Sequence, residues 1–255
     1  MAETFNLKIY RGSPGKQYWE EFVCDLVPMA NVISCLMEIQ KNPVNAKGEK
    51  VSPVVWEQGC LEEVCGSCSM LVNGVPRQAC TALIRPILEK TENDTVTIAP
   101  LTKFPLVRDL VVDRTVMFEN LKKVSAWIDV DGAYDRGPGP KVSQRKQEIR
   151  YILSTCMTCG CCTESCPQVN ERSKFIGPAT FAQVRLFNSH PTGRMQRRKR
   201  LRPMMEEGGI ADCGNAQNCV RVCPKHIPLT DAIAAIGRDV NLEAFRELFS
   251  FPDRD

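Results

Sequence analysis

The cysteines of this chain are its most constraining feature, because they fall into three runs with metal-ligand spacing. The chain has 255 residues and 14 cysteines. The first run, C-x4-C-x2-C-x11-C, contains Cys60, Cys65, Cys68 and Cys80. The second, C-x2-C-x2-C-x3-C, contains Cys156, Cys159, Cys162 and Cys166, followed by Pro167, and the third contains Cys213, Cys219 and Cys223, followed by Pro224. Met1–Arg11 has no apolar stretch typical of a signal peptide, so we expect a reducing compartment and metal rather than disulfides.

The first run has the spacing of a plant-type [2Fe–2S] loop. Gly59 and Gly66 allow tight turns that bring amide groups towards the sulfurs. Zinc is the alternative, but zinc sites usually pair two short knuckles, which this asymmetric spacing fits poorly. We therefore predict that Cys60, Cys65, Cys68 and Cys80 hold [2Fe–2S].

The second and third runs have the arrangement of two-cluster ferredoxins, in which the fourth cysteine of a run binds the other cluster. This pattern assigns a [4Fe–4S] cluster to Cys156, Cys159, Cys162 and Cys223. The other set has Ala216 where a middle cysteine would stand, and three thiols suit a [3Fe–4S] cluster at Cys166, Cys213 and Cys219. The alternative there is a [4Fe–4S] cluster with one water-bound iron, as in hydro-lyases.

Three cysteines remain outside these sets. Cys161 would break the spacing of the second run, Cys24 lies on an expected strand, and Cys35 lies on the apolar face of an expected helix. Free cysteine often behaves as a small buried hydrophobe, and we expect that role for all three.

The chain divides by pattern into residues 1–105 and residues 106–255. In the first part Phe5, Leu7 and Ile9 alternate as in a strand, and Asn73-Gly74 is a hairpin signal. Apolar residues at helical spacing follow, at Val32, Cys35, Leu36 and Ile39. Strands around one helix with a long cysteine loop favour a β-grasp, plant-type ferredoxin domain.

Residues 106–255 are predicted to form an all-α, bacterial-ferredoxin-like domain, so the fold class is α+β. The expected helices cover 107–121, 144–155, 181–187, 195–205 and 229–249. A Gly- and Pro-rich stretch at 131–140 predicts an irregular connection. Arg194, Arg198 and Arg202 share one helix face within a basic run, which we interpret as a solvated face, with an anionic headgroup or acidic partner surface as the alternative.

With these three cysteine runs, the chain resembles the iron–sulfur subunits of succinate dehydrogenase and fumarate reductase, respiratory complex II. The resemblance covers nearly the whole chain and rests on three motifs in order: CLEEVCGSC at 60–68, CMTCGCCTESCP at 156–167 and CGNAQNCVRVCP at 213–224. It implies a route for single electrons from the FAD of a separate flavoprotein subunit, through [2Fe–2S], [4Fe–4S] and [3Fe–4S], to a membrane quinone. It also implies a membrane-anchor cytochrome b subunit as the second partner.

One departure within the family concerns the quinone. Ubiquinone-reactive members resemble one another in having tryptophans shortly after the Cys-Pro matched to Cys166-Pro167, and a histidine at the position of Gly214. This chain has Gln168 in place of such aromatic residues and is similar to the menaquinone type with a single dihaem b anchor. Only position suggests that Pro167 and Gln168 lie near the quinone. The resemblance implies a peripheral location on the cytoplasmic face of the bacterial membrane.

The sequence excludes several other functions. It has no G-x-G-x-x-G motif for FAD or NAD, so the dicarboxylate chemistry belongs to a partner and no catalytic residue is expected here. A net charge of +3 gives no reason to expect nucleic acid as a partner. Another quinone-linked dehydrogenase remains an alternative, as does an open-iron hydro-lyase. The direction, succinate oxidation or fumarate reduction, is not encoded in these motifs.

Overall fold

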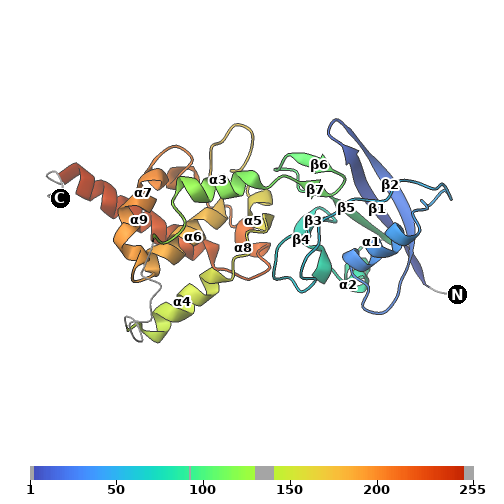
Figure 1. Cartoon of the computed structure of the whole chain (residues 1–255), viewed down its shortest axis with the longest axis horizontal. Coiled ribbons are helices and arrows are strands. Elements are labelled where there is room, and N and C mark those ends of the chain that lie inside the picture. The colour runs from blue at the N-terminus through green and yellow to red at the C-terminus, as the bar shows by residue number, and fades with distance from the viewer. Residues whose placement is uncertain (1–2, 92, 130–140, 250–255) are drawn as a thin grey trace. The chain divides into compact units, whose positions relative to one another are not determined.

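The computed structural model describes residues 3–91, 93–129 and 141–249, which form two compact units. The first unit comprises Met1–Arg114 and Cys159–Ser165, and the second comprises Thr115–Thr158 and Cys166–Asp255 (Figure 1). The connection expected at 131–140 lies outside the described residues. The first unit contains a sheet and the second is helical, so the α+β prediction is confirmed.

Within its described part, the first unit is built on a five-stranded sheet in the order β2-β1-β5-β3-β4. β1 runs antiparallel to β2 and parallel to β5. The predicted strand residues Phe5, Leu7 and Ile9 are all buried on the core face of β1, which confirms that alternation. The strands are β1 (Thr4–Ser13), β2 (Lys16–Asp25), β3 (Ser69–Val72), β4 (Val75–Gln78) and β5 (Thr95–Ala99).

The helix α1 (Val32–Lys41) packs its apolar face into the same core. It begins at a capping box, in which the Asn31 side chain accepts from the Ser34 backbone N–H and the Ser34 hydroxyl accepts from the Asn31 N–H, each at 2.9 Å. The predicted face, Val32, Cys35, Leu36 and Ile39, is buried as expected, and Ile33 is buried beside it. The cap therefore fixes which residues α1 turns inward.

The predicted hairpin is also confirmed, and it positions the last cysteine of the first run. Asn73 and Gly74 have φ of 48° and 75°, the left-handed backbone that a two-residue hairpin turn requires. After β4 the chain enters a short 3-10 turn, η1 (Ala79–Thr81), which carries Cys80, and then α2 (Ile84–Leu88).

The helix predicted over 107–121 is wrong in its first half. That segment forms β6 (Leu106–Arg108) and β7 (Val111–Val112), and α3 (Thr115–Lys123) begins only afterwards. Asp109 has a φ of 50° and is buried, with its carboxylate accepting from the N–H groups of Gly12 (2.8 Å) and Val55 (2.9 Å). These long-range bonds, together with an ion pair to Arg11 at 3.3 Å, hold Asp109 in a turn that a helix cannot contain.

A short helix from the second cysteine run, α5 (Cys161–Glu164), belongs to the first unit. The buried Glu164 carboxylate accepts from the Thr102 N–H at 2.9 Å, the Thr102 hydroxyl at 2.6 Å and the Lys103 N–H at 3.0 Å. A carboxylate with these donors fixes the segment in place.

The described part of the second unit packs its helices around one apolar core, which includes Phe181, Leu201, Met204 and Ile236. Among the helix predictions, that over 229–249 matches α9 at both ends. The elements are α4 (Gln144–Ser154), α6 (Pro178–Ser189), η2 (Gly193–Gln196), α7 (Arg197–Met205), η3 (Ile210–Asp212), α8 (Asn218–Arg221) and α9 (Leu229–Phe249). No helix in the described ranges is both long enough and apolar enough to cross a bilayer.

Arg194, Arg198 and Arg202 of the basic run are exposed, as the solvated-face interpretation requires, although Arg194 lies in η2 and only the other two lie in α7. Three ion pairs join α7 to α9: Arg197–Asp239 at 3.2 Å, Arg198–Glu243 at 2.8 Å and Arg202–Glu247 at 3.3 Å. Arg200 is fully buried and donates to the carbonyl oxygens of Ser125 (3.0 Å) and Gly193 (2.6 Å). Burial lowers the pKa of Arg200. Several of these basic side chains thus form ion pairs or hydrogen bonds within the second unit.

Candidate metal centres

The first cysteine loop turns its own amide groups towards a thiol. Leu61, Glu63 and Gly66 have φ of 61°, 55° and 75°, so the backbone repeatedly enters the left-handed region. As a result the N–H groups of Glu62, Val64 and Cys65 lie 3.3, 3.2 and 3.3 Å from the Cys60 sulfur. Amide N–H groups aimed at a ligand sulfur are among the features that set the potential of a bound cluster.

Cys65 lies at the exposed part of this loop. The Cys60 N–H donates to the Cys65 sulfur at 3.4 Å, and the Ser67 hydroxyl lies 3.3 Å from the same atom. These hydrogen bonds, that from Cys60 first, lower the pKa of Cys65 to about 6. A Cβ at Gly59 would stand 3.0 Å from the Cys65 sulfur, so glycine there leaves room for the thiol.

Cys68 and Cys80 form the buried side of the same site. The Ala79 N–H donates to the Cys68 carbonyl at 3.0 Å, which joins the start of β3 to the 3-10 turn. Burial, with further contributions from Cys80, raises the pKa of Cys68 to about 12. The structure therefore pairs Cys60 with Cys65 and Cys68 with Cys80, and a bound iron ion would replace the proton that burial favours.

Gln78 links this site to Cys161 inside the first unit. Its side chain is fully buried, accepts from the Cys68 thiol at 3.5 Å, and donates to the Ser69 hydroxyl at 2.8 Å and the Cys161 sulfur at 3.6 Å. Cys161 is fully buried, as expected for a spare thiol, but it also hydrogen-bonds Cys159. That bond lowers the pKa of Cys159 to about 7. The sequence signalled neither Gln78 nor this second role of Cys161.

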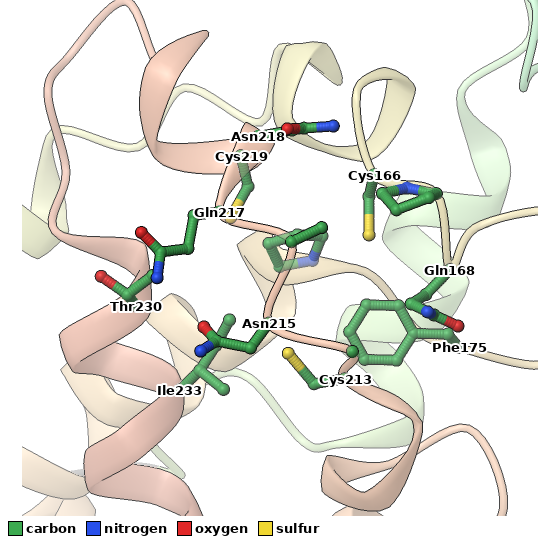
Figure 2. Close-up of a pocket in the computed structure, with 14 residues that line it drawn as sticks. Cys166, Gln168, Phe175, Cys213, Asn215, Gln217, Asn218, Cys219, Thr230 and Ile233 are labelled. Atoms are coloured by element: carbon green, nitrogen blue, oxygen red, sulfur yellow. The ribbon is translucent and has the colours of Figure 1, made fainter.

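A separate thiol site lies in the second unit, where Cys166, Cys213 and Cys219 line one pocket (Figure 2). Figure 2 shows their three sulfurs turned towards the middle of the pocket. Burial, followed by the charge of Cys166, raises the pKa of Cys219 to about 11, and Cys213 adds to the increase. The structure thus brings together the three thiols that spacing assigned to [3Fe–4S].

The loop between Cys213 and Cys219 forms one wall of this pocket. Asn215 and Gln217 have φ of 51° and 61° and flank Ala216, the residue at the gap in the cysteine spacing. Ala216 lines the pocket, so the position of the missing thiol faces the same space as the three that are present. Three soft donors and a methyl group around one space fit a cluster with three protein ligands.

Pro167 and Gln168 also line this pocket, which places both suggested quinone residues beside the three thiols. A Cβ at Gly214 would lie 2.5 Å from the Gln168 side-chain nitrogen. Gln168 therefore occupies the space next to Gly214, where a larger residue would have to displace it.

The predicted [4Fe–4S] set is divided between the units. Cys159 and Cys162 belong to the first unit, and Cys156 and Cys223 belong to the second. Cys156 follows α4 directly, and the Cys223 sulfur accepts from the Ile227 N–H at 3.4 Å. This set stays a prediction.

Within the described residues, no three histidine, cysteine or carboxylate side chains form a group that could hold a single metal ion. Iron–sulfur ligands differ from such a group, because the thiolates bind several irons that sulfide bridges, rather than one shared ion. The two thiol sites are therefore compatible with clusters as donor sets.

Two family models match the chain. Residues 6–119 match a 2Fe-2S iron-sulfur cluster binding domain, and residues 152–227 match a 4Fe-4S dicluster domain. The first covers the loop with Cys60, Cys65, Cys68 and Cys80, and the second covers the other two cysteine runs.

Similar proteins include the succinate dehydrogenase iron-sulfur subunit of Bacillus subtilis, 58% identical over 91% of this chain and 90% of that protein. The fumarate reductase iron-sulfur subunit of Escherichia coli O6:H1 is 32% identical over 71% of this chain and 70% of its own length. A chain of the Mycobacterium smegmatis Sdh1 complex in the apo form has the same fold, with a TM-score of 0.77, 22% identity and coverage of 96% of this chain and 98% of that one.

Proposed function

This chain belongs to the family of succinate dehydrogenase and fumarate reductase iron–sulfur subunits, and on that premise we propose how its residues serve electron transfer. The subunit holds [2Fe–2S], [4Fe–4S] and [3Fe–4S] clusters, which, when bound, carry single electrons between the FAD of a flavoprotein subunit and a membrane quinone. The chain is an oxidoreductase subunit that contributes no dicarboxylate site of its own.

We assign the cysteines of the three runs as ligands of the three clusters. Each cluster has its own set: Cys60, Cys65, Cys68 and Cys80 for [2Fe–2S]; Cys156, Cys159, Cys162 and Cys223 for [4Fe–4S]; Cys166, Cys213 and Cys219 for [3Fe–4S]. The observation that carries this proposal is the pocket in which three thiols and Ala216 line one space. For the divided [4Fe–4S] set, the support is the spacing and the match to a dicluster domain. We also propose that residues 1–105 form the [2Fe–2S] domain and that residues 106–255 form the domain of the other two clusters.

The protein's residues supply binding, orientation and electrostatics. Amide N–H groups of the first loop donate to the Cys60 sulfur, and the Ser67 hydroxyl lies within hydrogen-bond distance of the Cys65 sulfur. In the other site Cys166 and Cys219 are buried, so the protein shields two of its three thiols from solvent. Hydrogen bonds and solvent exposure are among the features that set cluster potentials.

The partners in this proposal are a flavoprotein subunit and a membrane-anchor cytochrome b, with menaquinone as the quinone and haem b in the anchor. Pro167 and Gln168 are proposed to lie near the quinone, since they line the pocket of the three thiols. Gln168 beside Gly214 supports a departure from the ubiquinone pattern, because the histidine of that pattern would need the space that Gln168 fills. The subunit is proposed to sit peripherally on the cytoplasmic face of the membrane.

Low-temperature EPR of the native complex tests this function. In the oxidised sample we expect a signal near the free-electron position from the three-thiolate cluster. Reduction with succinate should abolish that signal and produce a [2Fe–2S] signal. An oxidised sample without a signal would contradict the assignment of [3Fe–4S] to Cys166, Cys213 and Cys219. A signal that appears as expected but does not respond to succinate would contradict the electron route.

A further inference from the structure

Two of the three cysteines left over from the cluster sets meet in the first unit. Cys24 lies near the end of β2 and Cys35 lies in the first half of α1. Their side chains are in hydrogen-bond contact with one another. Both residues are buried, with exposed fractions of 8% and 5%, as expected for small hydrophobes. Their mutual contact, however, makes them a pair of thiols rather than two separate packing residues.

Ordinary features of the fold hold this pair in place. In β2, Cys24 stands opposite Phe5 of β1 and shares the inward face with Phe22. In α1, the Asn31 cap sets the start of the helix, and the Cys35 N–H donates to the Asn31 carbonyl at 3.1 Å. The register of the sheet and the cap of the helix therefore fix both sulfurs independently.

The contact shifts the pKa values of the two thiols in opposite directions. The hydrogen bond from Cys24 lowers the pKa of Cys35, because it stabilises a thiolate there. The same bond and burial raise the pKa of Cys24, which keeps its proton. Two thiols in contact, one of which ionises more readily than the other, can serve as a nucleophilic and a resolving cysteine.

A cavity beside the pair offers a route for a small reagent. A cavity of about 600 Å³ is lined by both cysteines. Polar groups around it include Asp25, Ser34 and Asn45, so the cavity can hold water and small polar solutes. Low exposure of the two residues is thus compatible with chemical access through this cavity.

We propose that Cys24 and Cys35 are a redox-active dithiol that closes to a disulfide between β2 and α1, with a hydroperoxide as the oxidant. The Cys35 thiol first releases its proton to solvent, and its thiolate attacks one oxygen of hydrogen peroxide. The O–O bond breaks, a sulfenic acid forms, and the other oxygen leaves as hydroxide, which takes up a proton from solvent to become water. The Cys24 sulfur then attacks the Cys35 sulfur, and the sulfenic oxygen leaves as a second water with the Cys24 proton. The two thiols together lose two electrons and two protons, and hydrogen peroxide is reduced to two waters.

Trypsin can release both cysteines in a single peptide, so one mass measurement tests for the disulfide. Trypsin cleaves after Lys16 and Lys41, and the peptide Gln17–Lys41 contains Cys24 and Cys35 and no other cysteine. The isolated native complex is treated with increasing hydrogen peroxide, alkylated with iodoacetamide, digested and measured by mass spectrometry, and cluster EPR is recorded on the same samples. The cluster cysteines lie in other peptides, so they do not enter the readout.

The expected result is a Gln17–Lys41 peptide that is lighter by two hydrogen atoms and carries no alkyl group, at peroxide doses that leave the EPR signals intact. Dithiothreitol before alkylation should restore the doubly alkylated peptide. The matched control is Cys24→Ser, in which Cys35 should instead form a sulfenic acid that dimedone traps.

Two results would overturn the proposal. One is a peptide that stays doubly alkylated until the clusters are destroyed. The other is a disulfide that forms only after the cluster signals are lost, which would mean that unfolding brings the thiols together. Both are read on the unmodified chain, so a variant that fails to fold does not affect them. The result is independent of the electron-transfer proposal, because neither cysteine belongs to a cluster set.

Discussion

The two thiol sites that lie within single units are built in contrasting ways. In the first, three of the four thiols come from one short loop, 60–68, and the loop's own amides surround the Cys60 sulfur. In the second, Cys166 and the Cys213–Cys219 loop come from distant parts of the chain and meet because helices pack around them. A local site depends on backbone conformation, whereas an assembled site depends on the folded unit.

The largest effect is expected from removing a thiol of the assembled site. Cys219→Ala leaves two thiols where the cluster needs three. Loss of a supporting residue alone typically reduces metal affinity or activity by about 10–100-fold, so loss of a ligand should exceed that. We expect the oxidised EPR signal to vanish and quinone reduction by succinate to fall accordingly.

The control for that variant is Cys161→Ala, which also removes a buried thiol but lies outside the three cluster sets. It should retain all cluster signals, although its contacts with Cys159 and Gln78 are lost. If Cys161→Ala abolished a cluster, Cys161 would have to be counted as a ligand; if Cys219→Ala kept the oxidised EPR signal, the assignment of Cys219 would be wrong.

The next effect tests the gap in the assembled site. Ala216→Cys supplies a fourth thiol facing the pocket, and we expect conversion of [3Fe–4S] towards [4Fe–4S] with a lower potential. Each fall of about 59 mV changes the one-electron equilibrium constant tenfold, so electron delivery to the quinone should slow. Redox-titrated EPR measures both changes, and Ala216→Ser is the control of similar size. An unchanged cluster type in Ala216→Cys would refute the role given to this position.

Removal of iron should reveal the contrast between exposed and buried thiols. After chelation, Cys65, whose pKa is lowered to about 6, is a thiolate above that pH. Cys219, whose pKa is raised to about 11, stays protonated until much higher pH. Alkylation of Cys65 should therefore level off above about pH 7, and that of Cys219 should still rise at pH 10. Peptide fragment spectra give both profiles, and identical profiles would refute the contrast.

The smallest effect concerns one hydrogen bond in the local site. Ser67→Ala removes the hydroxyl next to the Cys65 sulfur and should lower the [2Fe–2S] potential, because that bond favours the more negative, reduced state. A net hydrogen bond contributes about 1 kcal/mol, or about 40 mV for one electron, and solvent at this exposed sulfur reduces the shift. Ser67→Thr keeps the hydroxyl and should keep the potential. Equal shifts in the two variants would point to packing as the cause.

The same contrast explains what the sequence could predict. The strand at Phe5–Ile9, the hairpin at Asn73-Gly74 and the inward face of α1 depend on neighbouring residues, and all three were predicted correctly. The helix over 107–121 was wrong because Asp109 is held by Gly12, Val55 and Arg11, partners about 50 to 100 residues away. Apolar periodicity has no access to such contacts.

Within the candidate sites, cysteine spacing was enough to predict which thiols meet in the second unit. The three-thiol pocket was predicted because Ala216 interrupts a regular pattern. Gln78 gave no such signal, since a single glutamine in a strand has many possible partners and only the fold places it against Cys68 and Cys161. The meeting of Cys24 and Cys35 likewise depends on how β2 and α1 pack.

The ion pairs between α7 and α9 have a consequence for experiments on the whole complex. Washing with concentrated salt is a usual way to ask whether a basic segment holds a protein on a membrane. In this chain such a wash would also screen the exposed Arg202–Glu247 pair and its neighbours, and so loosen two helices of the subunit itself. Detachment of the subunit in salt would then have two explanations: a lost contact with the membrane, or weakened ion pairs between α7 and α9. Exchanging Arg202 and Glu247 would separate them, because the exchange keeps the ion pair between the helices but changes the charge that α7 presents.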